Sequence, residues 1–529
     1  MTGDTSQYFI QAYKWITTGQ VDVIWSPLYS IFYGFFLHLT SDAYFATVLH
    51  RSAIVLIISI LLLTVMRRLF PPFIAWFLTF WWVCLYVNYG ALYEVHLFTV
   101  IPVLVMLLAS LITNSKVLAR VLLLSLMLAT SLFIRNEFIF SFVFLLMYSI
   151  FSEYRSMKLN KISLKFIVTA YLLPFMLVIF VFLFAFVNDP HNVDQMKNMM
   201  KSKHTLNMAQ VYSFGYHQRH LSFQENPWMH YHKTMKSTFG SESPSFLQMS
   251  KNNFKATFDH VLWNIKLLPS GIELLLFDKS SGKFNPGYES YHLNRKSTKA
   301  LDYLLISILF VGVILILVDY HKWKQWLESN ELFLMLMLSM LPVSAIVIIT
   351  QRPRPEYLYN LSIFIIVIAG LSIWAILSKC KIYKLSKIVS PIVILVIFTI
   401  VLSSKLVLGS KPWLDTYRNL KPYGHLIAAE DAHFLSVGYS TEVQSYIRHK
   451  KGHTFDYSSL NAYGASGKSL FDILHRNKIN IFYINNAARN NIPQEQVDEF
   501  FNSYAQNSWI VLAHGGWGDD AWWLFKKNC

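Results

Sequence analysis

Four small groups of ionisable residues lie directly beside long apolar runs of this sequence. Charged side chains are costly at membrane depth, so each group is a candidate functional site. A carboxylate can serve as a general base, and a guanidinium is suited to clamp a phosphate through two charge-assisted hydrogen bonds. The candidates are Asp4 with Tyr8, Glu94 with His96, Arg135 with Glu137, and Arg352 with Arg354 and Glu356.

The first two groups each allow a chemical and a structural interpretation. Asp4 is a candidate base for an acceptor hydroxyl, with Tyr8 one turn away, but Asp is also a common helix N-cap residue. Glu94 and His96 are candidates for binding a substrate hydroxyl or a metal ion. They are equally well explained as the solvated end of an apolar helix. Their separation by two residues puts them on different faces of a helix, so joint action needs a broken first turn.

The other two groups contain arginines. Arg135 and Glu137 are wedged between two apolar runs, which favours either a phosphate- or sugar-binding pair or an ion pair that ties two helices together. Arg352 and Arg354 are candidates for a phosphate clamp, and anchoring at the membrane interface is the alternative. Pro355 is suited to open the helix that follows.

Metal and nucleotide chemistry are weakly supported. A divalent metal remains an alternative, because histidines recur in one polar stretch, but no cysteine or tight ligand spacing accompanies them. No cofactor is therefore assigned. A Gly-rich phosphate loop is missing, and so is an Asp-x-Asp triplet, which disfavours an enzyme that grips a nucleotide diphosphate through a metal. The histidines are His217, His220, His230 and His232.

The composition indicates a polytopic α-helical membrane protein. Hydrophobic residues make up 54% of the 529 residues and charged residues only 14%, whereas soluble domains carry about 25% charged residues. Apolar runs of roughly 20 residues recur, which is the length that spans a bilayer as a helix. The predicted spans are 47–66, 72–90, 95–113, 118–134, 137–152, 164–187, 300–319, 331–350, 356–378 and 386–408.

The basic residues occupy alternate connections between these spans, and the positive-inside rule places those connections in the cytoplasm. By parity, all four candidate groups then lie on the extracytoplasmic face of the plasma (inner) membrane. The net charge of +16 is assigned to these loops and not to nucleic-acid binding. The basic connections contain Arg67 and Arg68; Lys116 and Arg120; Arg155, Lys158, Lys161 and Lys165; Lys322 and Lys324; and Lys379, Lys381, Lys384 and Lys387.

Three extracytoplasmic parts surround the membrane helices of 47–187 and 300–408. Residues 1–46 have apolar positions at helical spacing, which predicts amphipathic interfacial helices. Residues 188–299 form a long loop, interpreted as an aromatic and polar cap over a sugar pocket. Residues 409–529 show the pattern of a small α/β domain. Its predicted strands are 433–438, 479–484, 509–514 and 521–525, and its predicted helices are 441–449, 468–477 and 494–504.

The chain resembles the GT-C superfamily of glycosyltransferases, in particular the group of protein mannosyltransferases and the lipid A aminoarabinose transferase. The resemblance extends over about residues 1–410 and implies inverting transfer from a polyprenyl-phosphate sugar. It also implies that Asp4 is the base, that Glu94 contacts a substrate, and that Arg352 and Arg354 stabilise the departing phosphate. It rests on Gly3-Asp4, Tyr8, Gly19, Ser26-Pro27-Leu28-Tyr29, Glu94, Arg135-Asn136-Glu137 and the stretch 352–357.

One feature departs from that family. Its members usually have a cytoplasmic N-terminus and a span before the catalytic Asp loop, whereas Asp4 is the fourth residue here. Either the short N-terminal tail is translocated by itself, or a span precedes this sequence.

Two other classes of function are open. One is a transporter or flippase of polyprenyl-linked glycans, although such proteins tend to show repeated halves and polar residues at mid-membrane depth. The other is a non-catalytic envelope-assembly protein that binds through its C-terminal domain. The expected partners are a polyprenyl-phosphate sugar donor, a lipid or glycan acceptor and membrane lipids, without nucleic acid.

Overall fold

The computed structural model divides the chain into two compact units, which are described separately. One unit comprises Met1–Val21, Ser30–His50 and Val407–Cys529, and the other comprises Asp22–Tyr29 and Arg51–Leu406. The structure describes residues 4–40, 42–85, 88, 94–113, 116–158, 164–186, 190–220, 227–287, 293–380, 417–427, 429, 431–437, 453–456, 469–486, 492–516, 518 and 521–528.

The larger unit is a bundle of apolar helices. Seven helices in the described part of the chain are long and apolar enough to cross a membrane, which is the construction of a multi-pass membrane protein. The apolar helices of the bundle are α3 (Ala43–Leu69), α4 (Pro72–Val83), α5 (Glu94–Ile112), α6 (Lys116–Phe133), α7 (Ile139–Lys158), α8 (Leu164–Phe186), α13 (Arg295–Val318), α15 (Glu331–Thr350) and α16 (Tyr359–Cys380).

Seven of the ten predicted spans correspond to the seven helices that are long and apolar enough to cross a membrane. The other three predicted spans are 72–90, 164–187 and 386–408. The predicted span 164–187 coincides with α8, of 23 residues. The predicted span 72–90 contains α4, which ends at Val83 after 12 residues. Twelve helical residues cover about 18 Å, which is short of the roughly 30 Å hydrocarbon core. The predicted span 386–408 lies outside the described residues.

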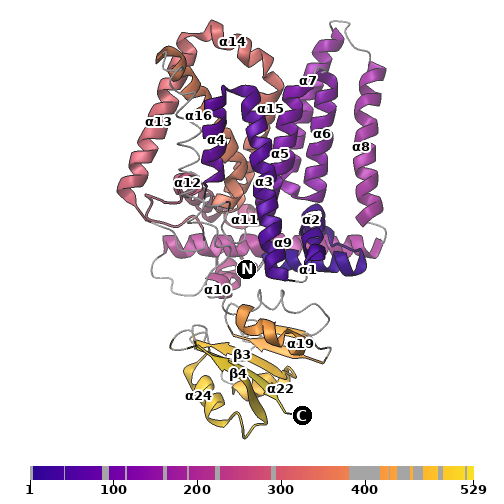
Figure 1. Cartoon of the computed structure of the whole chain (residues 1–529), viewed down its shortest axis with the longest axis vertical. Helices are drawn as coiled ribbons and strands as arrows, with labels where there is room; N and C mark the ends of the chain where they lie inside the picture. The colour runs from indigo at the N-terminus through magenta and orange to yellow at the C-terminus, as the bar shows by residue number, and fades with distance from the viewer. Residues whose placement is uncertain are drawn as a thin grey trace. The chain divides into compact units, whose positions relative to one another are not determined.

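The helices of the bundle are packed side by side, with contacts among α5, α6, α7 and α15 (Figure 1). The short helix α14 (Tyr320–Ser329) and the turn between α3 and α4 lie at one end, and α9 (Pro190–Arg219) crosses the other end (Figure 1). The predicted cytoplasmic connections 67–71 and 319–330 therefore share one end of the bundle.

Arg120 differs from its predicted place in a cytoplasmic loop. Because α6 already begins at Lys116, Arg120 lies inside the bundle and is only 4% exposed. Its guanidinium approaches Glu153 Oε1 of α7 to 2.6 Å, and the hydroxyl of Tyr171 on α8 donates to the same oxygen at 2.9 Å. The ion pair and the Tyr171 hydroxyl therefore join α6, α7 and α8. Removing one partner of a buried ion pair leaves an uncompensated charge, which is strongly destabilising.

The predicted long loop of 188–299 is mostly helical. Asn253 caps α12 by accepting a hydrogen bond from the Ala256 N–H at 3.0 Å. At the other end of α12, the buried carboxylate of Glu273 accepts hydrogen bonds from both Ser280 and Ser281, which fixes the turn that follows. The helices of this segment are α9, α10 (Pro227–Phe239), α11 (Phe246–Asn252) and α12 (Phe254–Phe277).

The smaller unit contains a mixed five-stranded sheet of order β2-β1-β3-β5-β4. β1 pairs in parallel with β2 and β3, and β5 is antiparallel to both β3 and β4. All four predicted strands correspond to observed strands, β2 was not predicted, and the predicted helix 441–449 lies outside the described residues. The elements are β1 (His433–Ser436), β2 (His453–Asp456), α22 (Leu470–Arg476), β3 (Ile481–Asn485), α24 (Gln494–Ser503), β4 (Trp509–Gly515) and β5 (Trp522–Lys527).

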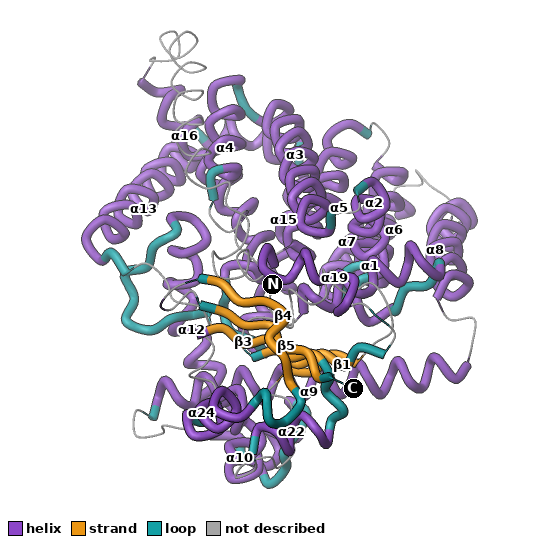
Figure 2. Tube along the Cα trace, turned by 60° about the horizontal axis from the view of Figure 1, so that its bottom comes forward, coloured by secondary structure: helices purple, strands orange, loops and turns teal. Residues whose placement is uncertain are grey.

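The two faces of the sheet have different covers. Successive strand residues point to opposite faces, so Phe482 packs with α22 and α24 whereas Ile481 and Tyr483 pack on the other side. That second side packs against residues of α1 (Asp4–Thr18), α2 (Pro27–Leu39), the start of α3 and the segment 417–427. Helices α1 and α19 (Gly424–Ile427) lie beside the strands in Figure 2. The N-terminal helices contributing to this core supply Phe9, Ala12, Tyr33, Leu37 and Ala46.

The N-terminal segment and the C-terminal domain, which the sequence presents as separate parts, thus share one apolar core. The sheet has two apolar faces, and α22 and α24 cover only one of them. The N-terminal helices and residues 417–427 together bury the other face, so the core of the C-terminal domain includes N-terminal residues.

A charged contact reinforces this packing. Asp42 Oδ1 accepts hydrogen bonds from the Phe45 N–H and the Tyr417 hydroxyl, at 3.0 and 3.1 Å, while Oδ2 binds Lys421 Nζ. Burial would raise the pKa of Asp42, but the bonds from Lys421 and Phe45 outweigh burial and lower it.

We expect Asp42→Asn to lower the stability of this unit by about 0.5–1 kcal/mol at pH 7, since Lys421 is half exposed and solvent screens the pair. A lowered carboxyl pKa adds stability above its unfolded value of 3.8, and that stability disappears as the pH falls through the folded value. Thermal unfolding of both proteins from pH 7 down to pH 3 measures this difference. A deficit that persists unchanged at the lowest pH contradicts the electrostatic account.

Candidate functional site

The connection between α6 and α7 places Arg135 and Glu137 together. Ile134 and Arg135 both hydrogen-bond back to the Thr130 carbonyl, which ends α6, and a single 3₁₀ turn (η3, Asn136–Phe138) leads into α7. Across that turn, Arg135 Nε donates to Glu137 Oε1 at 2.7 Å. Both side chains are about one-fifth exposed, so the pair faces a partly open environment.

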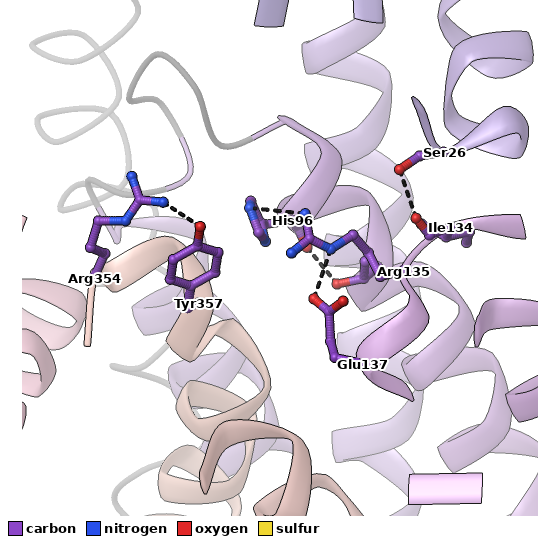
Figure 3. A network of polar contacts seen from close by, with 8 residues as sticks. Ser26, His96, Ile134, Arg135, Glu137, Arg354 and Tyr357 are labelled. Atoms are coloured by element: carbon purple, nitrogen blue, oxygen red, sulfur yellow. Dashed lines mark hydrogen bonds and ion pairs between the residues drawn. The ribbon is translucent and has the colours of Figure 1, made fainter. Parts of the chain in front are cut away.

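Ser26 fixes this connection from the N-terminal side of the same unit. Its Oγ donates to the Ile134 carbonyl at 2.6 Å, next to Arg135 (Figure 3). Ser26 has φ 51°, a left-handed conformation that non-glycine residues rarely adopt, and Pro27 then begins α2. The buried ring of Tyr29 packs against Phe98 of α5 at 5.6 Å between centroids. The stretch 26–29 therefore positions Arg135.

His96 links Arg135 to the connection between α15 and α16. Its Nε2 lies 3.5 Å from Arg135 Nη1, and its ring meets the ring of Tyr357 edge to face at 4.8 Å between centroids (Figure 3). Arg354 Nη2 donates to the Tyr357 hydroxyl, and the guanidinium lies 4.4 Å from the centroid of that ring. Two arginines from distant connections are thereby joined through one imidazole and one phenol.

Glu356 belongs to a 3₁₀ turn (η4, Pro355–Leu358) that Pro355 opens, as the sequence predicted, and Arg354 directly precedes this turn. Arg354 Nη1 lies 2.9 Å from Glu356 Oε1, and Glu356 is 4% exposed. Below, the polar cluster means His96, Arg135, Glu137, Arg354, Glu356 and Tyr357.

A small cavity of about 20 Å³ lies within this cluster. Its polar lining comes from His96, Glu137, Glu356 and Tyr357, together with Thr99 and Asn360. Asn360 is 7% exposed, and its Oδ1 accepts no hydrogen bond from the part of the chain that the structure describes. Since about 10–15 Å³ suffices for one water, the cavity accommodates a single group such as a hydroxyl.

Arg352 is not part of the polar cluster. Its side chain is fully buried, and its Nε donates to the Pro286 carbonyl at 3.0 Å. Its Nη2 donates to Gln218 Oε1 at 3.0 Å and to the Asn285 carbonyl. Trp263 Nε1 donates to the same Gln218 oxygen. Arg352 thus holds the segment that follows α12, whereas its proposed role at a phosphate stays a prediction.

Asp4, Glu94 and Tyr8 are not assigned to the cluster, and their roles stay predictions. Asp4 begins α1 and Glu94 begins α5, but their side chains lie outside the described part of the structure. Tyr8 lies on α1 in the other unit and is 5% exposed. Of the nine predicted site residues, five therefore belong to the polar cluster.

The predicted site residues do not include Thr99 and Asn360, and they include Tyr357 only as the last residue of the stretch 352–357. A usable signal existed for Tyr357, because it follows Arg354 by three residues and such a spacing brings side chains together in a 3₁₀ turn. Thr99 follows His96 by the same interval, and its Oγ1 donates to the His96 carbonyl at 2.6 Å. Asn360 had no such signal.

Metal ligation has no support in the described side chains, among which no group of three or more His, Cys, Asp or Glu residues has metal-binding geometry. Within the described part of the long segment 190–287, His230 and His232 lie 6.4 Å apart between ring centroids, and His220 packs against Tyr216.

The cluster combines strong donors with strong acceptors. Guanidinium groups only donate, ionised carboxylates only accept, and a hydroxyl does both. A ligand rich in hydroxyl groups can therefore satisfy both kinds of partner at once, and an anion is served by the two arginines. The arrangement suits a sugar that carries a phosphate.

Neither a protein-family model nor a curated protein sequence matches this chain. Among solved structures, the chain is similar to ArnT from Cupriavidus metallidurans in the apo state. The TM-score is 0.40 and 11% of residues are identical, over 99% of this chain and 93% of that chain. The overall similarity is low, and the function proposed below rests on the geometry of the polar cluster.

Proposed function

We propose that this chain is an inverting glycosyltransferase. It moves a sugar from a polyprenyl-phosphate donor to a lipid or cell-envelope glycan acceptor on the extracytoplasmic face of the plasma membrane. The observation that carries the proposal is the polar cluster, in which Arg135 and Arg354 converge from two connections at the ends of apolar helices.

The cluster supports a division of labour among its residues. Arg354 and Arg135 meet the negative charge that develops on the departing polyprenyl phosphate, because fixed donors stabilise a transition state without reorganisation. Glu137, Glu356 and the Asn360 Oδ1 accept hydrogen bonds from sugar hydroxyls.

The reaction balances with one base. Asp4 takes the proton of the acceptor hydroxyl, and the resulting oxygen attacks the anomeric carbon. The bond from that carbon to the phosphate oxygen breaks as the new glycosidic bond forms, so the configuration inverts and polyprenyl phosphate leaves with the electron pair. Glu94 contacts the acceptor in this scheme.

A flippase of polyprenyl-linked glycans is the second candidate. A transporter needs a path through the whole bundle with polar residues along it. The Arg120–Glu153 pair is a buried polar feature of the bundle outside the polar cluster. Tyr171 donates a hydrogen bond to Glu153, so the pair joins three helices. This pair is better explained as a structural tie.

The test is transfer of a labelled sugar by the full chain reconstituted in vesicles, with envelope lipids and glycans as acceptors. We expect transfer from sugars on polyprenyl phosphate and none from the same sugars on a nucleotide. Vesicles without the protein are the control. Transfer from the nucleotide donor alone contradicts the proposal, and movement of the lipid-linked sugar between leaflets without transfer favours the flippase.

A further inference from the structure

Helix α12 exposes apolar side chains on the face that does not pack against the rest of its unit. Its buried face includes His260, Asn264 and Leu267. On the opposite side, at intervals of four, four and three residues, Phe254, Phe258, Leu262 and Ile265 are between 46% and 70% exposed. We call these four residues the α12 stripe.

The α12 stripe is continuous in sequence register and well ordered in geometry. The spacing of its members aligns them along one side of a helix. The rings of Phe254 and Phe258 are stacked at 6.0 Å between centroids. A row of exposed apolar residues this long on one helix marks an interaction surface.

The neighbours of α12 indicate what covers the stripe. α12 packs against α13, α15 and α16, beside the ends of these helices at which α9 lies (Figure 1). α13 is long and apolar enough to cross a membrane, and only 6% of its apolar window is buried inside the protein. The outer surface of α13 is therefore a lipid-facing surface, and α12 contacts this helix.

Basic residues flank the stripe. Lys255 and Lys266 are exposed and follow Phe254 and Ile265 directly, so both lie at one edge of the stripe. Lys266 Nζ lies 5.4 Å from the centroid of the Trp263 ring. Lysines that border an apolar helix face extend their ammonium groups toward lipid phosphates while their stems cover apolar surface.

We propose that α12 is an interfacial helix whose stripe enters the outer leaflet of the membrane, with Lys255 and Lys266 at the level of anionic headgroups. This role does not depend on the proposed sugar transfer. It gives the segment 188–299 a third attachment to the membrane besides the two helices at its ends.

The test uses the full chain in phosphatidylcholine vesicles that contain phosphatidylglycerol. Cys84, Cys380 and Cys529 are replaced by Ala, and a fluorophore is attached at Leu262→Cys or, independently, at Ile265→Cys. Ser243→Cys, at the exposed polar turn before α11, is the matched control. We expect nitroxide-bearing lipids to quench both stripe labels and aqueous iodide to quench only the control.

The outcomes separate the occupants of the stripe. Quenching of both stripe labels by iodide and not by nitroxide lipid shows a water-facing surface and overturns the proposal. Quenching by neither shows that protein covers the stripe, which also overturns it. Further, Lys255→Gln and Lys266→Gln should each weaken association of spin-labelled phosphatidylglycerol by about fivefold, whereas Lys236→Gln on α10 should not.

Discussion

Arg354→Gln is expected to lower sugar transfer by about 10²–10³-fold while the protein remains folded. The reason is that a fixed donor aimed at developing charge is worth this factor when it is removed from a transition state. Arg354 is one-fifth exposed and lies beside the cavity, in contact with Glu356 and Tyr357. The measurement is kcat/KM for the lipid-linked donor, together with thermal unfolding in the same detergent.

Arg352→Gln is the matched control, because it changes the same residue type two positions away. Arg352 donates to the Pro286 and Asn285 carbonyls and to Gln218. Gln218 Oε1 keeps the hydrogen bond from Trp263 Nε1, so the substitution leaves the two carbonyls without this donor. Each costs about 1–3 kcal/mol, and we expect a loss of about 2 kcal/mol or more in stability. Residual activity per folded molecule should fall less than for Arg354→Gln.

The comparison decides between the two arginines as ligands of the phosphate. If Arg352→Gln keeps the thermal stability of the wild type and loses transfer as completely as Arg354→Gln, then Arg352 also binds the phosphate. Its hydrogen bonds to the protein would then matter little for stability. If Arg354→Gln keeps full transfer, the polar cluster is not the place where the leaving group is stabilised. Arg354→Lys, which keeps the charge and loses the fork, should restore only part of the activity.

The candidate site shows what local sequence predicts well. The pairing of Arg135 with Glu137 across a short turn between apolar helices was among the predictions, and the structure contains it. The pairing of Arg354 with Glu356 was not predicted, although it has the same two-residue spacing. Pro355 marks the start of such a turn because its fixed φ and missing N–H suit a first helical position. These features depend on a few neighbouring residues and can therefore be predicted from the sequence.

Long-range contacts could not be predicted from one sequence. Nothing in the spacing indicates that Ser26 donates to a carbonyl 108 residues later. Nor does the sequence distinguish Arg352 from Arg354, although Arg352 is fully buried and Arg354 contacts Glu356 and Tyr357, which line the cavity. The packing of helices selects between two equivalent side chains, and that selection depends on distant residues such as Gln218.

The smaller unit shows the same difference between local features, which the sequence predicts, and long-range packing, which it does not. Short apolar runs bounded by turn residues predicted buried strands, because such runs are a local property. A strand that is apolar on both sides implies two faces that need covers. Which helices provide them is decided by the whole chain, and the cover formed by α1 and α2 comes from the opposite terminus.

Asp4→Asn should lower transfer by about 10²–10⁴-fold, the range that general base catalysis contributes. The substitution separates the two interpretations of Asp4, which begins α1. Asn caps a helix about as well as Asp, so α1 and the core that it shares with the sheet should keep their stability. Asn has no basic carboxylate, so only a chemical role is lost.

The assay compares kcat for the wild type, Asp4→Asn, Asp4→Ala and Asp42→Asn in reconstituted vesicles. Asp42→Asn is the control, because it removes a carboxylate from the same unit and should leave kcat nearly unchanged. Full activity in Asp4→Asn with a loss of thermal stability in Asp4→Ala identifies Asp4 as a cap. The base would then have to come from another carboxylate, and Glu94, which begins α5 two residues before His96, is the next to test. Loss of kcat in both Asp4 variants with unchanged stability identifies a base, and it places the start of α1 at the reacting hydroxyl.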